Sequence, residues 1–457
     1  MLLDQAVSHA GHIQRYAGLH GSSDALALSQ FAAKTRPLVV ITETAQDAQR
    51  LLEEIPYFAP QSKVNLLPDW ETLPYDSFSP HQDLVSERLA TLYHITHNDC
   101  DVAIVPVTTA LYRLPHPSYL AAYTFFIKQG EKLDGGTLRS QLSLAGYTHV
   151  TQVVAPGEYS VRGGLIDLFP MGSALPYRID LLDEEIESIR TFDVDSQRSV
   201  YPVNEIRLLP AREFPLDKDS QERFRRNFRE HFEGDPSKSS LYKDVSQGLA
   251  PAGIEYYLPL FFDETATLFD YLPQQAVLCL HRDVVRSMEN FWRDTQSRYE
   301  LLRGDRNRPL LPPQVIFLTM DRFFAGCKAF PRIEIAAGEN TGAVQCATAS
   351  LPPVAVDRRA QNPLSSFSTF VQDFDGRVLL LAESQGRREI MNEYVNEYGL
   401  TPIPCESFKA FKHDSKRFML CASPLHNGFI LEDDRIAIVT ESELYAAQAR
   451  RRPPAPP

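Results

Sequence analysis

The sequence predicts an α/β fold: a mostly parallel sheet with an α+β insert, followed by a second, smaller α/β unit. Strand and helix signals alternate in the first third of the chain. Short alternating segments with turn residues replace them between about residues 120 and 210, and a new strand–helix alternation begins at Arg377. Strands that alternate with helices are typical of a parallel sheet covered on both faces.

The first third contains apolar runs of the buried-strand type, each followed by a helical pattern. The predicted strands are residues 38–42, 64–67 and 102–105, and the predicted helices are residues 45–55 and 84–95. Thr44 can cap the first of these helices, and Pro106 stops the last strand. A later apolar run, 276–280, predicts another buried strand after the insert.

The insert carries the pattern of a β-hairpin. Two alternating runs, 177–182 and 186–192, flank a polar turn. Because successive side chains of a strand point to opposite faces, the first run should present one mixed polar face made of Arg178, Asp180 and Leu182. Tyr177, Ile179 and Leu181 share the other face and should supply core contacts.

These patterns divide the chain into five parts. They are a discontinuous α/β domain over residues 1–119 and 210–335, an inserted α+β domain over 120–209, a linker over 336–353, a small α/β domain over 354–449 and a basic, Pro-rich tail over 450–457. The linker is rich in small and polar residues and ends in two prolines. The tail cannot form a core because it consists mostly of Arg and Pro.

Composition and charge exclude several classes of protein. The chain of 457 residues is 43% hydrophobic and 23% charged, which is close to the globular norm. It has no apolar run of the ~20 residues that span a membrane, and its start does not resemble a signal peptide, so we expect a cytoplasmic protein without membrane contact. The net charge of −13 disfavours general DNA binding. No two of the six cysteines form a Cys-x-x-Cys pair, which favours free thiols over a zinc or redox site.

The best candidate for a nucleotide-binding loop is Gly21-Ser22-Ser23-Asp24-Ala25. A P-loop ends in a Lys that binds the phosphates and a Ser or Thr that binds magnesium. Here Asp24 stands at the Lys position and Ala25 at the hydroxyl position. A carboxylate at that place repels phosphate. The loop therefore predicts a degenerate site without ATP hydrolysis.

No catalytic or metal-binding constellation is evident elsewhere. The predicted strand at 276–280 is followed by His281-Arg282-Asp283, not by the acidic pair expected near a magnesium-bound nucleotide. We therefore expect no catalytic residue, no cofactor and no metal ion in this sequence.

The longest motif is LPDWETLPYDSFSP over residues 67–80, and it continues through Ser86-Glu87-Arg88. Six further blocks follow, over residues 157–170, 176–180, 192–198, 251–257, 308–313 and 382–389. Together these blocks resemble the bacterial transcription-repair coupling factor (Mfd) family and, more distantly, the excision-repair protein UvrB. The resemblance covers at least residues 36–450.

This resemblance implies a UvrB-like, helicase-type parallel-sheet domain with a degenerate P-loop. It also implies that the inserted domain binds UvrA, and the family's contact residues carry over onto Arg162, Arg178 and position 182. This chain has Leu182 where an aromatic side chain is usual, so an apolar contact can remain but stacking cannot. The DNA-clamping β-hairpin of UvrB would fall near residues 76–86, which are too few and contain one aromatic residue, Phe78.

The resemblance thus predicts a non-catalytic module that recruits UvrA, and with it nucleotide excision repair, to stalled RNA polymerase. RNA polymerase and double-stranded DNA would be bound by domains that follow this region in the family's full-length protein, an ATP-dependent translocase. One such C-terminal domain would mask the UvrA-binding face by an intramolecular contact.

Four alternatives remain open from the sequence. The weakest is a DNA-binding domain that acts alone, because the net charge of −13 and the short hairpin region count against it. The chain could be a helicase or translocase fragment with residual nucleotide or DNA binding. The proposed face could be an ordinary solvated surface with a weak Arg178–Asp180 ion pair, worth about 0–1 kcal/mol. Residues 354–449 could serve as a spacer or make an autoinhibitory contact.

Overall fold

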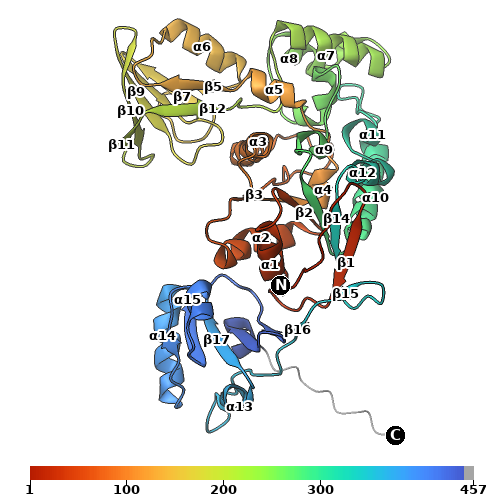
Figure 1. Ribbon diagram of the computed structural model, residues 1–457. Coiled ribbons are helices and arrows are strands. Elements are labelled where there is room, and N and C mark those ends of the chain that lie inside the picture. Colours follow the sequence, from red (N-terminus) through yellow and green to blue (C-terminus); the bar gives the residue numbers. More distant parts are fainter. Residues whose placement is uncertain (447–457) are drawn as a thin grey trace.

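The computed structural model describes residues 1–446, and its largest element is a seven-stranded parallel sheet (Figure 1). The strand order is β15-β1-β14-β13-β2-β4-β3, and every neighbouring pair is parallel. The bounds are β1 Ile13–Ala17, β2 Leu38–Thr42, β3 Val64–Leu66, β4 Val102–Pro106, β13 Val277–His281, β14 Arg332–Ile335 and β15 Val344–Gln345. The predicted parallel sheet and its four predicted strands are confirmed.

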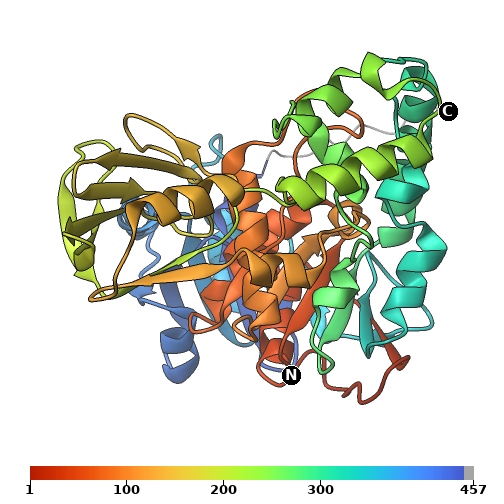
Figure 2. The ribbon, with the colours of Figure 1, turned by 90° about the horizontal axis from the view of Figure 1, so that it is seen from above.

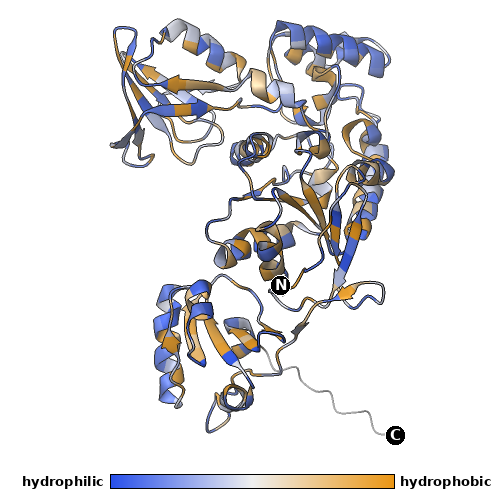
Figure 3. Cartoon of the chain, in the orientation of Figure 1, coloured by the Kyte–Doolittle hydropathy of each residue, from blue (hydrophilic) through white to orange (hydrophobic). Residues whose placement is uncertain are grey.

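Helices cover both faces of this sheet. One face packs against α1 (Ser23–Ala32) and α2 (Ala45–Phe58), and the other packs against α3 (Gln82–Thr96), α10 (Val284–Leu302) and α12 (Met320–Cys327). The central strands β2, β4 and β13 are buried at every position, which is why they are hydrophobic except at Thr42 and His281, the last residues of β2 and β13 (Figure 3). Thr44 caps α2 as predicted, because its hydroxyl accepts a hydrogen bond from the Asp47 N–H at 3.0 Å.

The remaining helices of this part are mostly short. They are α4 Val107–Ala110, α5 Pro117–Ala122, α7 Lys218–His231, α8 Ser240–Ser246, α9 Leu268–Tyr271, α11 Pro313–Ile316 and two 3-10 helices, Pro236–Lys238 and Ile254–Phe261. Most of them enclose a second, aromatic-rich core around Trp70, whereas α4 and α9 pack into the first core.

We call the seven-stranded sheet and the helices around it the body. Between α5 and α7 the chain forms a six-stranded sheet that projects from the body (Figures 1 and 2). Its order is β11-β10-β9-β8-β7-β6, and only the β6–β7 pair is parallel. The bounds are β6 Thr148–His149, β7 Glu158–Arg162, β8 Leu165–Leu168, β9 Tyr177–Leu182, β10 Glu185–Phe192 and β11 Ser199–Val203. Helix α6 (Gly135–Leu144) and a separate antiparallel pair, β5 (Phe125–Lys128) and β12 (Glu205–Leu208), complete this region.

The predicted β9–β10 hairpin and its two faces are confirmed. Leu182 pairs with Glu185, so the turn itself consists of two residues, and the first of them, Asp183, has a φ of 58°. Ile179 is fully buried, and its neighbours Tyr177 and Leu181 pack against the same core.

The last part of the described chain is a second α/β unit with a six-stranded sheet in the order β16-β20-β21-β17-β19-β18. We call this unit the third domain. Its strands are β16 Thr348–Ala349, β17 Arg377–Ala382, β18 Ile403–Pro404, β19 Phe418–Ala422, β20 Phe429–Leu431 and β21 Ile436–Thr440. Its helices are α13 Ser365–Asp373, α14 Gln385–Glu397, α15 Phe408–His413 and α16 Glu441–Leu444.

The segment expected to be a linker, residues 336–353, is attached to both neighbouring sheets. It contributes β15, which pairs with β1, and β16, which pairs with β20. The tail expected over residues 450–457 lies outside the described residues. Over the described part of the chain, no helix has both the length and the apolarity that crossing a membrane requires.

Candidate functional site

A buried carboxylate lies beneath the polar face of the inserted sheet. Asp167 of β8 is 2% exposed and lies directly opposite Arg178 of β9. Arg178 donates from Nε to Asp167 Oδ1 at 2.8 Å and from Nη2 to Oδ2 at 3.2 Å. Arg162 of β7 donates from Nη2 to the same Oδ2 at 2.7 Å. Asp167 therefore orients both arginines that the sequence analysis selected.

Arg178 is restrained on every side. Its Nη1 donates to the Gln197 carbonyl at 3.0 Å, and its guanidinium lies 4.8 Å from the centre of the Phe192 ring. The side chain is only 17% exposed, and its hydrogen bonds with Asp167 raise the pKa of Arg178. The weak Arg178–Asp180 pair considered from the sequence is wrong, because a carboxylate on the neighbouring strand binds the guanidinium instead.

Arg162 and Leu182 provide the solvent-facing part of this site. The Arg162 side chain is 57% exposed although it contacts Asp167, and Leu182 is 64% exposed. The strand register places both residues on one face of the sheet, because Arg162 and Asp180 both pair with Leu165 and Leu182 lies two residues further along β9. An exposed cation beside an exposed apolar group on a rigid sheet suits protein recognition.

The loop considered for nucleotide binding leads into a buried ion cluster. Asp24, the second residue of α1, is 3% exposed, 2.6 Å from the Arg50 guanidinium and 2.8 Å from His281 Nε2. Burial alone would raise the pKa of Asp24, but hydrogen bonds from His281 and Arg50 hold it well below its usual range. Position 24 thus holds a buried carboxylate that is paired with Arg50.

The neighbours of Asp24 complete this cluster. Glu54, fully buried, accepts hydrogen bonds from Arg50 at 2.9 Å and from the Ser22 hydroxyl at 3.0 Å, and burial raises the pKa of Glu54. The Ser23 hydroxyl is buried without a hydrogen-bond partner, and Ala25 is fully buried in the core. Gly21 precedes them with a φ of 53°, the left-handed conformation that favours glycine. The five predicted residues lie together, but they do not present a cation or a magnesium-binding hydroxyl to a phosphate.

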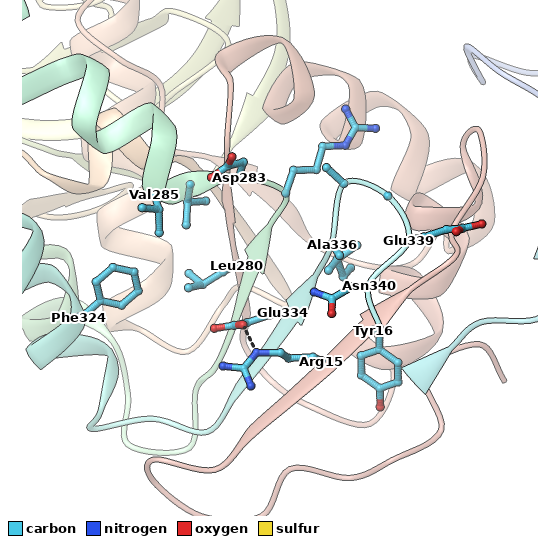
Figure 4. A pocket seen from close by; sticks show the side chains of 15 residues that line it. Arg15, Tyr16, Leu280, Asp283, Val285, Phe324, Glu334, Ala336, Glu339 and Asn340 are labelled. Atoms are coloured by element: carbon cyan, nitrogen blue, oxygen red, sulfur yellow. Dashed lines mark hydrogen bonds and ion pairs between the residues drawn. The ribbon is translucent and has the colours of Figure 1, made fainter. Parts of the chain in front are cut away.

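A hollow of about 360 Å³ lies at the carboxyl ends of β1, β13 and β14 (Figure 4). Open parallel sheets bind ligands at this edge. Here, however, Arg15 pairs with Glu334 at 2.9 Å and Arg282 pairs with Asp47 at 2.9 Å, so both arginines on the wall are neutralised. Within residues 1–446, no group of three or more His, Cys, Asp or Glu side chains is arranged to hold a metal ion.

The longest sequence motif makes core contacts. Trp70 Nε1 donates to one carboxylate oxygen of Glu213 at 2.7 Å, and Arg88 Nε donates to the other at 2.8 Å. Arg88 is fully buried and also donates to the Pro68 carbonyl. Glu213 follows the insert, so this triad joins the end of the insert to the body. Sequence reasoning missed the triad because Glu213 lies 143 residues from Trp70.

Residues 76–86, where the resemblance would place the β-hairpin of UvrB, contain no strand. The chain runs from β3 to α3 as a loop, and Phe78 within it is 56% exposed.

Comparisons with known proteins place these features in a family context. Two family models match the chain: the UvrB interaction domain over residues 125–214 and the MFD D3 domain over residues 370–444. The chain is 41% identical, over 97% of its length, to the transcription-repair-coupling factor of Escherichia coli (strain K12), of which it covers 39%. It is 40% identical, over 94% of its length, to that of Haemophilus influenzae (38% of the relative covered) and 24% identical, over 96%, to that of Bacillus subtilis (39% covered). The chain thus spans about two-fifths of the length of the curated relatives it matches.

Proposed function

This chain is homologous over nearly its whole length to part of the transcription-repair-coupling factors, and we propose that it is the part through which such a factor recruits UvrA. The UvrB interaction domain matched at residues 125–214 contains Arg162, Arg178 and Leu182. Its presence in a transcription-repair-coupling factor supports a surface that binds the partner of UvrB.

The observation that carries this proposal is the exposed pair Arg162 and Leu182 beside a fixed Arg178. Asp167 holds the guanidinium groups in place, so little side-chain freedom is lost when a partner binds. Arg162 can donate to a carboxylate of the partner, and Leu182 can enter an apolar pocket. Arg178 acts mainly by fixing the surface, since most of its own donors are already occupied.

We infer that this chain does not hydrolyse ATP. The position of the phosphate-binding lysine is held by Asp24, whose carboxylate pairs with Arg50 and is hydrogen-bonded to His281. Ala25 offers no oxygen to magnesium. The cluster would have to be dismantled before a triphosphate could be bound.

The relatives are longer than this chain, and we assign their other activities to the regions that this chain does not cover. We expect binding of RNA polymerase and double-stranded DNA, and ATP-driven translocation, to depend on regions outside this chain. We also expect a C-terminal domain to cover the Arg162–Leu182 face in the resting full-length protein, and the site of action to be the cytoplasm.

A titration of the chain with UvrA, without nucleotide, tests the proposal. Arg162→Ala should weaken binding tenfold or more, the size expected for a hot-spot arginine. Arg139→Ala is the matched control, because Arg139 is exposed on α6, and α6 packs through Leu138 and Leu142 on the core side of the insert. The control should bind like the unmodified chain. Circular dichroism should show both variants folded.

Two outcomes would contradict the proposal. If the unmodified chain does not bind UvrA, this segment is not the recruiting part. If Arg162→Ala and Arg139→Ala weaken binding equally, the partner uses another surface of the insert.

A further inference from the structure

The loop before α1 is covered by the third domain. We propose that residues 18–23, which occupy the place of a phosphate-binding loop, serve as a receptor for the loop 425–428 of this chain's own third domain, so that the docked domain takes the position that a phosphate holds in such a loop. In Figure 1 the third domain lies directly beside α1 and α2.

The two loops are joined by reciprocal hydrogen bonds. The Ser22 N–H donates to the Asn427 carbonyl at 3.0 Å, and the Asn427 N–H donates to the Ser22 hydroxyl at 3.1 Å. A Cβ added at Gly21 would lie 2.1 Å from the Gly428 carbonyl oxygen, so the backbones touch at this point. Only a glycine at position 21 permits the contact.

Four of the loop amides that could bind a phosphate are already occupied. Phosphate-binding loops use backbone N–H groups at the start of a helix. Here the His20 N–H donates to the Thr348 hydroxyl at 3.0 Å, the Ser23 N–H to the His20 carbonyl at 3.0 Å, and the Ala25 N–H to Asp24 Oδ1 at 2.8 Å. Together with the Ser22–Asn427 bond, these contacts replace a ligand with the protein's own atoms.

Apolar contacts extend the interface beyond the loop. Leu26 of α1 is 3% exposed and belongs to the same buried cluster as Phe408 and Leu425 of the third domain. Phe408 meets Phe58 of α2 edge to face, with ring centres 4.9 Å apart. This burial gives the docked state a hydrophobic component that hydrogen bonds alone would lack.

The connecting segment supports the same arrangement. The Thr348 hydroxyl, in addition to accepting from His20, donates to the Gly18 carbonyl at 2.6 Å, and the Cys346 N–H donates to the Ala17 carbonyl at 2.8 Å. The segment between the two units is therefore bound to the receptor loop itself. While these hydrogen bonds persist, the connecting segment is too short to let the third domain move away from the loop.

Hydrogen–deuterium exchange of the full chain tests the docking. Gly21→Ala should raise exchange at least tenfold in both 18–26 and 425–431. Gly11→Ala is the matched control, because Gly11 is also left-handed, with a φ of 79°, but a Cβ there meets nothing within 4 Å. The control should leave both peptides as slow as in the unmodified chain. Exchange in β7–β9 of the insert should be unchanged in both variants, which shows that Gly21→Ala does not unfold the chain.

A second variant and a ligand probe separate the parts of the proposal. Thr348→Val keeps the shape of the side chain but removes its hydroxyl, and it should raise exchange at 18–26. Inorganic pyrophosphate should leave exchange at 18–26 of the unmodified chain unchanged. Docking through this loop is refuted if Gly21→Ala exchanges like Gly11→Ala at 425–431. Occupation of the loop by the third domain is refuted if pyrophosphate slows exchange at 18–26 while 425–431 stays protected, because a phosphate and the domain would then share the loop.

Discussion

Replacing Asp24 by lysine should destabilise the protein and should not restore a nucleotide site. Asp24 is 3% exposed and lies 2.6 Å from Arg50 and 2.8 Å from His281. Removing one member of a buried ion pair costs about 3–5 kcal/mol. A lysine adds a second buried cation beside Arg50, so we expect a total loss of about 5 kcal/mol or more, comparable with the whole stability of many domains.

Urea unfolding followed by circular dichroism and tryptophan fluorescence measures this loss. Trp70 and Trp292 both pack in the cores of the body, so they report on the part that contains Asp24. Asp83→Lys is the matched control, because Asp83 is also the second residue of a helix but its side chain is 64% exposed. The control shares the unfavourable helix-dipole effect of about 1 kcal/mol without the burial.

Two results would refute this reasoning about the ion cluster. One is an Asp24→Lys chain as stable as Asp83→Lys, which would mean that the buried charges do not depend on Asp24. The other is saturable ATP binding by a folded chain carrying both Asp24→Lys and Ala25→Thr, which would mean that the loop retains a usable phosphate site.

Three further predictions follow from the buried carboxylates. Glu213→Ala should lower the free energy of unfolding by about 3–5 kcal/mol, since it leaves the buried Arg88 unpaired; urea unfolding against an exposed Glu→Ala control measures it. Asp167→Asn should weaken UvrA binding and speed hydrogen exchange in β8 and β9, and unchanged binding would show that Asp167 does not position Arg162 for UvrA. Asp24 has a folded-state pKa below its unfolded value of about 3.9, so its stabilisation is complete above that value and is lost as pH falls through the folded pKa. The stability gap between the unmodified chain and Asp24→Asn should therefore be larger at about pH 7 than at about pH 3, and a gap that widens in acid would contradict the assigned direction.

Much of the local structure was determined by the sequence. The apolar runs at 38–42 and 102–105 became central strands, and Thr44 became the cap of α2. Alternation along 177–182 correctly separated Ile179, in the core, from Leu182, on the surface. These features depend on the period of side chains along one element, which the order of residues contains directly.

Which residues meet was decided only by the tertiary structure. One alternative left open by the sequence paired Arg178 with Asp180, but the register of β8 and β9 brings Asp167 opposite Arg178. The sequence showed that the loop before α1 lacks the phosphate-binding lysine. It did not show that Asp24 would contact His281, which lies 257 residues away.

The same holds for the contact between units. Residues 336–353 have the composition of a flexible linker, yet two short strands within them pair with separate sheets. Asn427 and Ser22 are 405 residues apart and meet only because the third domain docks on α1. Such contacts depend on strand order, register and domain placement, and these arise from long-range packing that no periodic pattern along the chain encodes.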